Sequence, residues 1–229
     1  FDHANNFSEG LASIKKDKYG YINRDGKTVI NEDFGAAHDF NGGLAKVNIT
    51  GKGWSFINKE GKLITEPRDE NRDDFGDGVV KVFKKSEGNV YINKEGRIMF
   101  KCREEFFYNY FHDGMSLIYV KDKGYGYINT DGRVIVEPHL ESANWFYNSM
   151  ARVKKNGKWG YIDKEGSFVI EQRFDFAHDF SDGLALVKNN GMYGYIDKKG
   201  IPVIDFQYEE ADYFYEGLAP VKKGGKWFF

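Results

Sequence analysis

The feature that most constrains this chain is an internal repeat of about 34 residues. An aromatic residue followed by Ile and then Asn or Asp recurs at steps of 35, 35, 36, 34 and 34 residues. These copies begin at Tyr21, Phe56, Tyr91, Tyr127, Tyr161 and Tyr195. A second signal, Phe-x-x-Gly, runs in phase with the first and begins at Phe7, Phe40, Phe75, Phe111, Phe180 and Phe214, with Phe146 and Ser149 as a variant. Together they predict a single repeat domain over residues 1–229, with six complete repeats and a truncated seventh.

Each repeat begins with two short segments that have the pattern of strands. After the Phe-x-x-Gly signal of the fifth repeat, Ala151 and Val153 stay apolar two positions apart, which is the period of a half-buried strand. The next segment, 158–163, places Trp159 and Tyr161 on one face, and we interpret Gly160 as room for a neighbouring ring. At the Trp159 position we expect rings that pack in the core or between repeats, namely Trp54, Trp159 and Trp227.

A turn then joins the second segment to a third. It has Asn or Asp at its first position and Gly at its fourth, as in Asp163 and Gly166. The Asx side chain accepts hydrogen bonds from the turn, and the glycine takes the positive φ of a tight hairpin. The apolar run 168–170 predicts the returning strand. Each repeat is therefore expected to be a three-stranded β-meander that completes its core by stacking on its neighbours.

The repeats can be arranged in two ways, as an open stack or as a closed propeller ring. A ring is usually sealed by a blade shared between the two chain ends. The last repeat of this sequence lacks a third strand, and the residues before Phe7 do not supply one. The sequence therefore predicts an all-β tandem array in which an open solenoid is favoured over a β-propeller.

The fifth and sixth repeats carry a family resemblance. Residues 158–166 read Lys-Trp-Gly-Tyr-Ile-Asp-Lys-Glu-Gly, and residues 180–185 read Phe-Ser-Asp-Gly-Leu-Ala. This pattern resembles the WG-repeat (KWG-repeat) family of mainly bacterial proteins, and the resemblance extends over essentially the whole chain. Departures occur where Ser55, Val90 and Phe228 replace the glycine. The resemblance implies a β repeat that binds a partner or acts as a scaffold, and it transfers no catalytic residue.

Composition narrows the classes of partner. Lys and Arg (33) nearly balance Asp and Glu (35), so there is no overall field that would attract nucleic acid. No apolar run is long enough to cross a membrane, and no leader is visible, so the chain reads as a mature or excised piece. Cys102 is the only cysteine, which excludes an internal disulfide. A secreted or cell-surface location is favoured, and the oligomeric state is open.

The sequence offers no pattern for catalysis or for a metal or other cofactor. The histidines are scattered rather than clustered, at His3, His38, His112, His139 and His178. No Ser or Cys stands out beside a histidine and a carboxylate. The acidic run 66–74 is interpreted as a solvated loop. The chain is therefore predicted not to be an enzyme.

A surplus of rings at one repeat position predicts a binding surface. The residue before the repeat Phe is polar in four repeats but aromatic at Tyr110, Trp145 and Tyr213. Further rings adjoin this position, so the predicted ligand-binding residues are Tyr108, Tyr110, Trp145, Tyr147, Tyr213 and Tyr215. Such rings suit a glycan or a protein segment. The alternative is a structural spacer or assembly scaffold that has no small ligand.

Overall fold

A computed structural model describes residues 1–68, 75–215 and 217–229, and for Glu32 the backbone alone. Every helix or strand element in this described part is a β-strand, which confirms the all-β class. Most of the acidic run interpreted as a solvated loop, from residue 69 onward, lies outside the described residues. The chain divides into two compact units. Unit 1 comprises 1–103 and 130–132, and unit 2 comprises 104–129 and 133–229. The single repeat domain stays a prediction.

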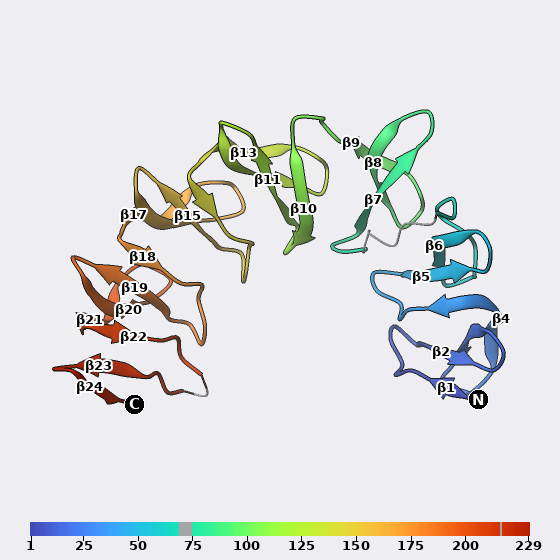
Figure 1. Cartoon of the computed structure of the whole chain (residues 1–229), viewed down its shortest axis with the longest axis horizontal. Helices are drawn as coiled ribbons and strands as arrows, with labels where there is room; N and C mark the ends of the chain where they lie inside the picture. Colours follow the sequence, from blue (N-terminus) through green and yellow to red (C-terminus); the bar gives the residue numbers. More distant parts are fainter. Residues whose placement is uncertain (69–74, 216) are drawn as a thin grey trace. The chain divides into compact units, whose positions relative to one another are not determined.

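Unit 1 holds the first three repeats (Figure 1). Its strands are β1 (His3–Ala4), β2 (Leu11–Lys15), β3 (Tyr19–Asn23), β4 (Thr28–Ala37), β5 (Leu44–Ile49), β6 (Gly53–Asn58), β7 (Val79–Lys84), β8 (Gly88–Asn93) and β9 (Ile98–Lys101). Strands β1 to β6 form one antiparallel sheet in chain order, because the long strand β4 pairs with both β3 and β5. Strands β7 to β9 form a second, three-stranded sheet.

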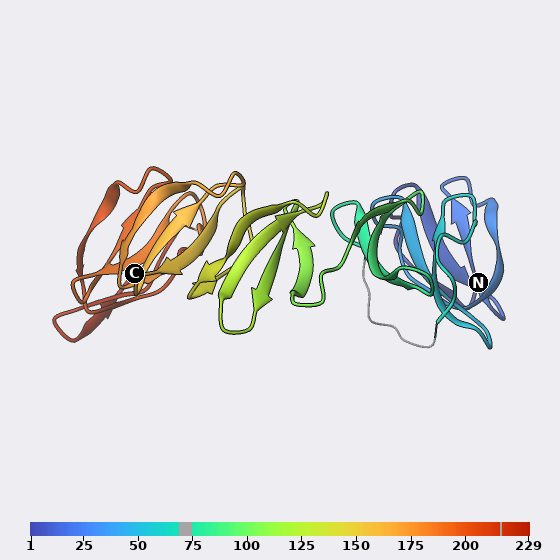
Figure 2. The same cartoon turned by 90° about the horizontal axis from the view of Figure 1, so that it is seen from above.

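Unit 2 contains four sheets that follow one another in chain order, as both views show (Figure 2). They are β10 (Phe107–His112), β11 (Met115–Val120), β12 (Gly124–Asn129) and β13 (Val134–Leu140); β14 (Ser142–Ala143), β15 (Ala151–Lys155), β16 (Lys158–Ile162) and β17 (Phe168–Phe174); β18 (Phe176–Ala177), β19 (Ala185–Asn189), β20 (Met192–Ile196) and β21 (Pro202–Tyr208); and β22 (Glu210–Ala211), β23 (Val221–Lys223) and β24 (Lys226–Phe228).

The predicted meander is confirmed and gains one strand. In the fifth repeat, β15, β16 and β17 pair antiparallel in chain order, as the sequence indicates. The two-residue strand β14 adds to the open side of β15 and was not predicted from the sequence. Strands β18 and β22 stand in the same place in the next two repeats. Among the described residues no sheet closes into a barrel.

The predicted hairpin turn forms as expected. In the fifth repeat the Asp163 Oδ1 atom accepts hydrogen bonds from the backbone N–H of Glu165 at 3.1 Å and of Ser167 at 2.8 Å. Gly166 has φ of +82°, which a residue with a side chain adopts only at a cost in energy. The turn that begins at Asn23 is made in the same way.

The glycine after the Trp position is required by a bulge in the third strand. Trp159 pairs with Phe174, whereas Tyr161, two residues later, pairs with Ile170. The extra residues of β17 therefore arch over Gly160. A Cβ atom at Gly160 would lie 2.6 Å from the carbonyl oxygen of Ile170. The neighbour that excludes a side chain is thus backbone, and the expectation of a neighbouring ring was wrong.

The repeats that lack this glycine form the third strand differently. In the third repeat Val90 takes the place of glycine and pairs directly with Lys101, so the bulge opposite this position is absent and only the register shift between Tyr91 and Ile92 remains. In the second repeat Ser55 takes this place, and its hydroxyl hydrogen-bonds to the carbonyl oxygen of Thr65 at 2.6 Å. Residues 61–68 there form only isolated bridges rather than a strand. The sequence departures therefore mark real changes in backbone path.

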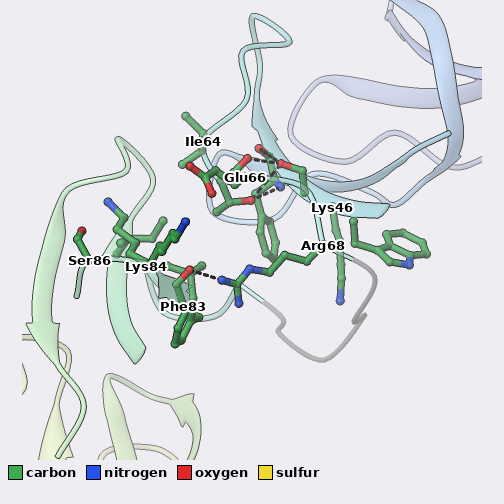
Figure 3. Close-up of a pocket in the computed structure, with 14 residues that line it drawn as sticks. Lys46, Ile64, Glu66, Arg68, Phe83, Lys84 and Ser86 are labelled. Atoms are coloured by element: carbon green, nitrogen blue, oxygen red, sulfur yellow. Dashed lines mark hydrogen bonds between the residues drawn. The ribbon is translucent and has the colours of Figure 1, made fainter. Parts of the chain in front are cut away.

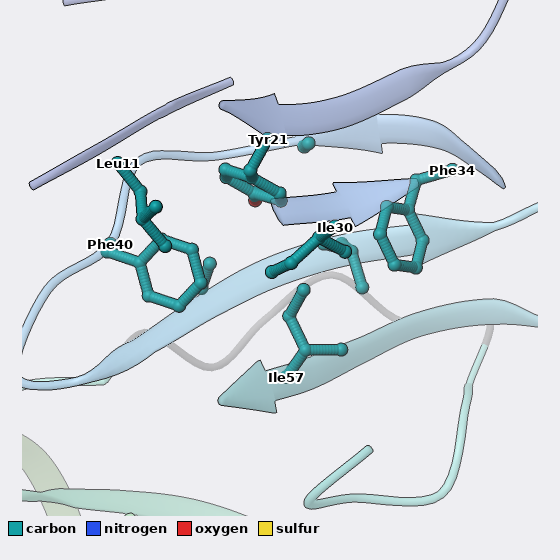
Figure 4. Packing of buried hydrophobic residues seen from close by; sticks show 9 residues of the cluster. Leu11, Tyr21, Ile30, Phe34, Phe40 and Ile57 are labelled. Carbon is teal, nitrogen blue, oxygen red and sulfur yellow. The ribbon is translucent and has the colours of Figure 1, made fainter. Parts of the chain in front are cut away.

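The sheet of the fifth repeat has a core on both of its faces. Val153 and Ile162 pack toward the preceding sheet with Leu117, whereas Tyr161 packs toward the following sheet with Val187. The prediction that only one face of the first strand is buried is therefore incomplete, because the variable position between the two apolar residues is also buried. Ser13, for example, is fully buried. Figure 4 shows the corresponding packing in unit 1 around Tyr21, Ile30, Phe40 and Ile57.

The buried tyrosines of the Tyr-Ile-Asx signal connect successive repeats. The hydroxyls of Tyr21, Tyr127, Tyr161 and Tyr195 each donate to a backbone carbonyl 17 residues later, as from Tyr161 to His178 at 2.6 Å and from Tyr195 to Asp212 at 2.7 Å. Burial raises the pKa of Tyr195 to about 12, because the ionised form would lose its hydration. The hydroxyls therefore stay protonated as donors at neutral pH.

The Trp position contributes less to the core than the sequence predicts. Trp159 is half-buried, with the Arg152 guanidinium 5.5 Å from its ring centroid. Trp227, on the edge strand β24 of its sheet, is 53% exposed. The expectation of a core ring at Trp227 was therefore wrong. In β16, the second strand of the meander in the fifth repeat, the most deeply buried ring is Tyr161, at 1% exposure.

Candidate aromatic binding edge

Two pairs of neighbouring Phe-x-x-Gly turns in unit 2 are connected by hydrogen bonds, from the fourth repeat to the fifth and from the sixth to the seventh. His112 Nδ1 lies 2.7 Å from the carbonyl oxygen of Phe146, and the Ser181 hydroxyl donates to the carbonyl oxygen of Phe214 at 3.3 Å. The residue after the repeat Phe thus reaches the backbone at the Phe of the following repeat. The turns therefore form one edge, on which equivalent positions lie in series.

A second set of contacts, which we call a carboxylate clasp, connects the fourth repeat to the fifth. Asp113 accepts a hydrogen bond from the backbone N–H of Ser149 at 2.7 Å, and its carboxylate lies 2.5 Å from the Lys164 ammonium. Burial acts to raise the pKa of Asp113, but these two donors together hold it below its usual range. In unit 1, Glu9 makes the equivalent contacts with Gly43 and Lys59.

Five of the six predicted site residues are exposed rings. Their exposed fractions lie between 40% and 71%, for Tyr110, Trp145, Tyr147, Tyr213 and Tyr215. The sixth, Tyr108, is half-buried on β10, with the ring of Phe106 5.8 Å away. We call the five exposed residues together with His112 the aromatic edge. All of them belong to unit 2.

The structure brings part of the aromatic edge together through His112. The imidazole lies 4.5 Å from the ring centroid of Tyr147 and is nearly parallel to Trp145, at 6.0 Å. From the sequence, His112 was predicted only to be one of five scattered histidines. Its repeat position could have placed it among the edge residues, since His112 stands in the fourth repeat where Tyr147 stands in the fifth.

Two further predicted residues, Tyr213 and Tyr215, lie in the seventh repeat, whereas Tyr108 and Tyr110 lie on β10 in the fourth. Tyr213 lies 5.6 Å from the imidazole of His178, and Tyr215 follows in the same turn. Between the two clusters the sixth repeat has Asp179 and Ser181 at the ring positions. Asp179 pairs with Arg152 at 3.0 Å, so this stretch is polar. The aromatic edge is thus two groups of rings separated by one repeat.

The described residues contain no group of three or more His, Cys, Asp or Glu side chains placed to hold a metal ion. Within that same part of the chain, no helix is long and apolar enough to cross a membrane. What the edge offers chemically is flat apolar ring faces with hydroxyl and imidazole groups at their borders.

Models of known protein families were compared with this chain, and one of them matches it. The model of the WG containing repeat matches residues 1–18, 19–52, 125–159, 159–193 and 193–227, which is more than half of the chain. The chain belongs to the WG containing repeat family. The unmatched stretch of this WG-repeat chain, residues 53–124, contains Ser55 and Val90. These residues replace the glycine in the second and third repeats, where the bulged third strand seen in the fifth repeat does not form.

Several solved structures are similar to this chain at low sequence identity. A eukaryotic initiation factor is 10% identical and similar over 95% of this chain and 70% of its own, with a TM-score of 0.50. The computationally designed Ika8 protein matches at 11% identity, 97% and 80% coverage and a TM-score of 0.39. BamB from Moraxella catarrhalis matches at 10% identity, 96% and 80% coverage and a TM-score of 0.35. The search of curated proteins finds no match.

Proposed function

We propose that this WG-repeat chain is a non-catalytic binding module whose aromatic edge holds a glycan. The supporting observation is that exposed Tyr and Trp rings occupy positions in stacked turns where other repeats carry Asp, Asn or Ser. The fold does not need rings there, since the turns of the first and sixth repeats form without them.

The edge suits a ligand that has flat apolar faces and many hydroxyls. Trp145 and Tyr147 present ring surface while the imidazole of His112 fixes their positions, so little side-chain entropy remains to be lost on binding. The second cluster, at Tyr213 and Tyr215, offers another contact along the same edge. A chain of sugars that spans both clusters gains affinity from each. We expect a dissociation constant in the range of about micromolar to millimolar.

A protein segment is the second candidate ligand. Phe107 and Leu218 of unit 2 are 68% and 59% exposed, and neither carries a polar tip that would favour a sugar. Exposed apolar side chains beside Tyr and Trp are typical of protein interfaces.

The test compares one variant on glycan and peptide arrays with the parent chain. We expect the parent to bind a group of related glycans, and Trp145→Ala to reduce that binding at least about tenfold because it removes one of the main ring faces. The variant should lose no more than about 1 kcal/mol of unfolding free energy, because the ring is exposed. Urea titration of both chains checks this second part.

Trp227→Ala is the matched control, because Trp227 is even more exposed than Trp145, at 53% against 41%, but stands on β24 rather than in a Phe-x-x-Gly turn. It should bind like the parent. Binding to peptides alone would select the protein partner. No binding on either array, together with a large loss of stability in Trp145→Ala, would show that the rings only pack between loops and that the chain is a spacer or scaffold.

A further inference from the structure

Unit 1 contains a cavity of about 520 Å³ that the aromatic edge does not involve. Its walls come from β6, from the irregular segment 61–68 and from the hairpin of β7 and β8 (Figure 3). Small-molecule sites typically have volumes of about 300–1,000 Å³, so this cavity has the right size for one.

The cavity exists because the second repeat lacks a side chain that fills the equivalent space elsewhere. In four other repeats the residue paired with the Trp position is large and apolar: Phe34, Leu140, Phe174 or Tyr208. Opposite Trp54 the paired residue is Arg68, which is exposed. Its guanidinium turns away to the neighbouring hairpin, where Nη2 donates to the carbonyl oxygen of Phe83 at 2.6 Å.

The lining of the cavity combines apolar surface with an excess of positive charge. Its cations are Lys46, Arg68, Lys84 and Lys85, whereas Glu66 is the single carboxylate among the described lining residues. Two of the cations are positioned by rings. The Arg68 guanidinium carbon lies 4.8 Å from the Phe83 centroid, and the Lys46 ammonium lies 5.8 Å from the Trp54 centroid.

The apolar part of the lining lies beside these charges. The rings of Trp54, Phe56 and Phe83 and the side chains of Val82 and Ile92 face the same space. A ligand that matches this lining needs an apolar body and one negative group. A guanidinium recognises a carboxylate through two parallel hydrogen bonds, which gives orientation as well as affinity.

We propose that this cavity binds a small organic anion, a carboxylate that carries an aromatic or aliphatic body. The carboxylate lies at Arg68 with Lys84 and Lys85 around it, and the body lies against Trp54 and Phe83. The site is independent of the aromatic edge, because it belongs to unit 1 and the edge belongs to unit 2. Failure of one proposal therefore leaves the other in place.

The test uses phenylbutyrate and its neutral amide, phenylbutyramide, as matched probes in isothermal titration calorimetry with the whole chain. We expect phenylbutyrate to bind with a dissociation constant of about 0.1–1 mM, and the amide at least about tenfold more weakly. Arg68→Gln should weaken phenylbutyrate by about tenfold or more and leave the amide unchanged. Arg24→Gln, an exposed turn arginine of unit 1 outside the lining, should leave both probes unchanged.

Arg68 also bridges two hairpins, so Lys85→Gln provides a second variant if Arg68→Gln does not fold. Lys85 is exposed, and its loss should weaken phenylbutyrate about threefold with no change in the melting temperature. Equal affinity for the acid and the amide would overturn the proposal. So would a phenylbutyrate affinity that is the same in the parent and in every lining variant that folds, or no measurable binding of either probe.

Discussion

At the scale of the residue, the glycine after the Trp position is explained by contact with backbone. At Gly160 a Cβ atom would lie 2.6 Å from the Ile170 oxygen and 2.7 Å from the Gln172 nitrogen. We therefore predict that Gly160→Ala lowers the free energy of unfolding by roughly 3 kcal/mol, because backbone cannot move aside as the end of a side chain can. Urea denaturation followed by circular dichroism measures the change.

Gly157→Ala is the control for this prediction, since it lies in the same hairpin. Gly157 has φ of +74° and open space where a Cβ atom would stand, so only conformational strain of about 1 kcal/mol is expected. If the two variants unfold at the same urea concentration, the bulge does not select glycine.

At the scale of the element, turns of successive repeats are connected by carboxylate clasps. Asp113→Asn keeps an acceptor for the N–H of Ser149 but removes the charge that pairs with Lys164. We expect a loss of about 1 kcal/mol at pH 7, as for a partly exposed ion pair with a charged hydrogen bond. The measurement is a urea titration at several pH values.

The pH dependence of this clasp has a definite sign. The pKa of Asp113 is lower in the folded chain than its ordinary value of 3.8, so the unfolded chain binds the proton more tightly. The contribution is therefore fully present above about pH 4 and is lost as the pH falls through the lower, folded value. Asp113→Asn and the parent should converge in stability there. Asp182→Asn, at the equivalent turn position two repeats later, serves as the control, and the idea fails if both variants show the same pH profile.

At the scale of the whole molecule, stability should be close to a sum of repeat and interface contributions, because buried clusters join consecutive sheets. Removing residues 217–229 deletes β23, β24 and the small contact of Ala219 with Leu186 and Tyr195. We predict that the shortened chain still folds and loses only a few kcal/mol in a urea titration. Complete loss of the β-sheet signal would contradict the open array that the sequence favours.

The sequence alone determined the repeat, the three strands of its meander and its turns. Period-two alternation at Ala151 and Val153 reports burial, and the Asx and glycine pair at Asp163 and Gly166 closes a local hairpin. These features depend on residues close in the chain. The exposed rings of the aromatic edge were predictable for the same reason, since Tyr110, Trp145 and Tyr213 break a periodic pattern.

The tertiary structure decided what depends on neighbours distant in the sequence. The role of Gly160 depends on a bulge in another strand, and His112 joins the aromatic edge only because the next repeat stacks against it. The cavity beside Trp54 is likewise defined by a missing partner on the facing strand and by charges from a different hairpin. Local patterns carry no information about such contacts, because packing between repeats creates them.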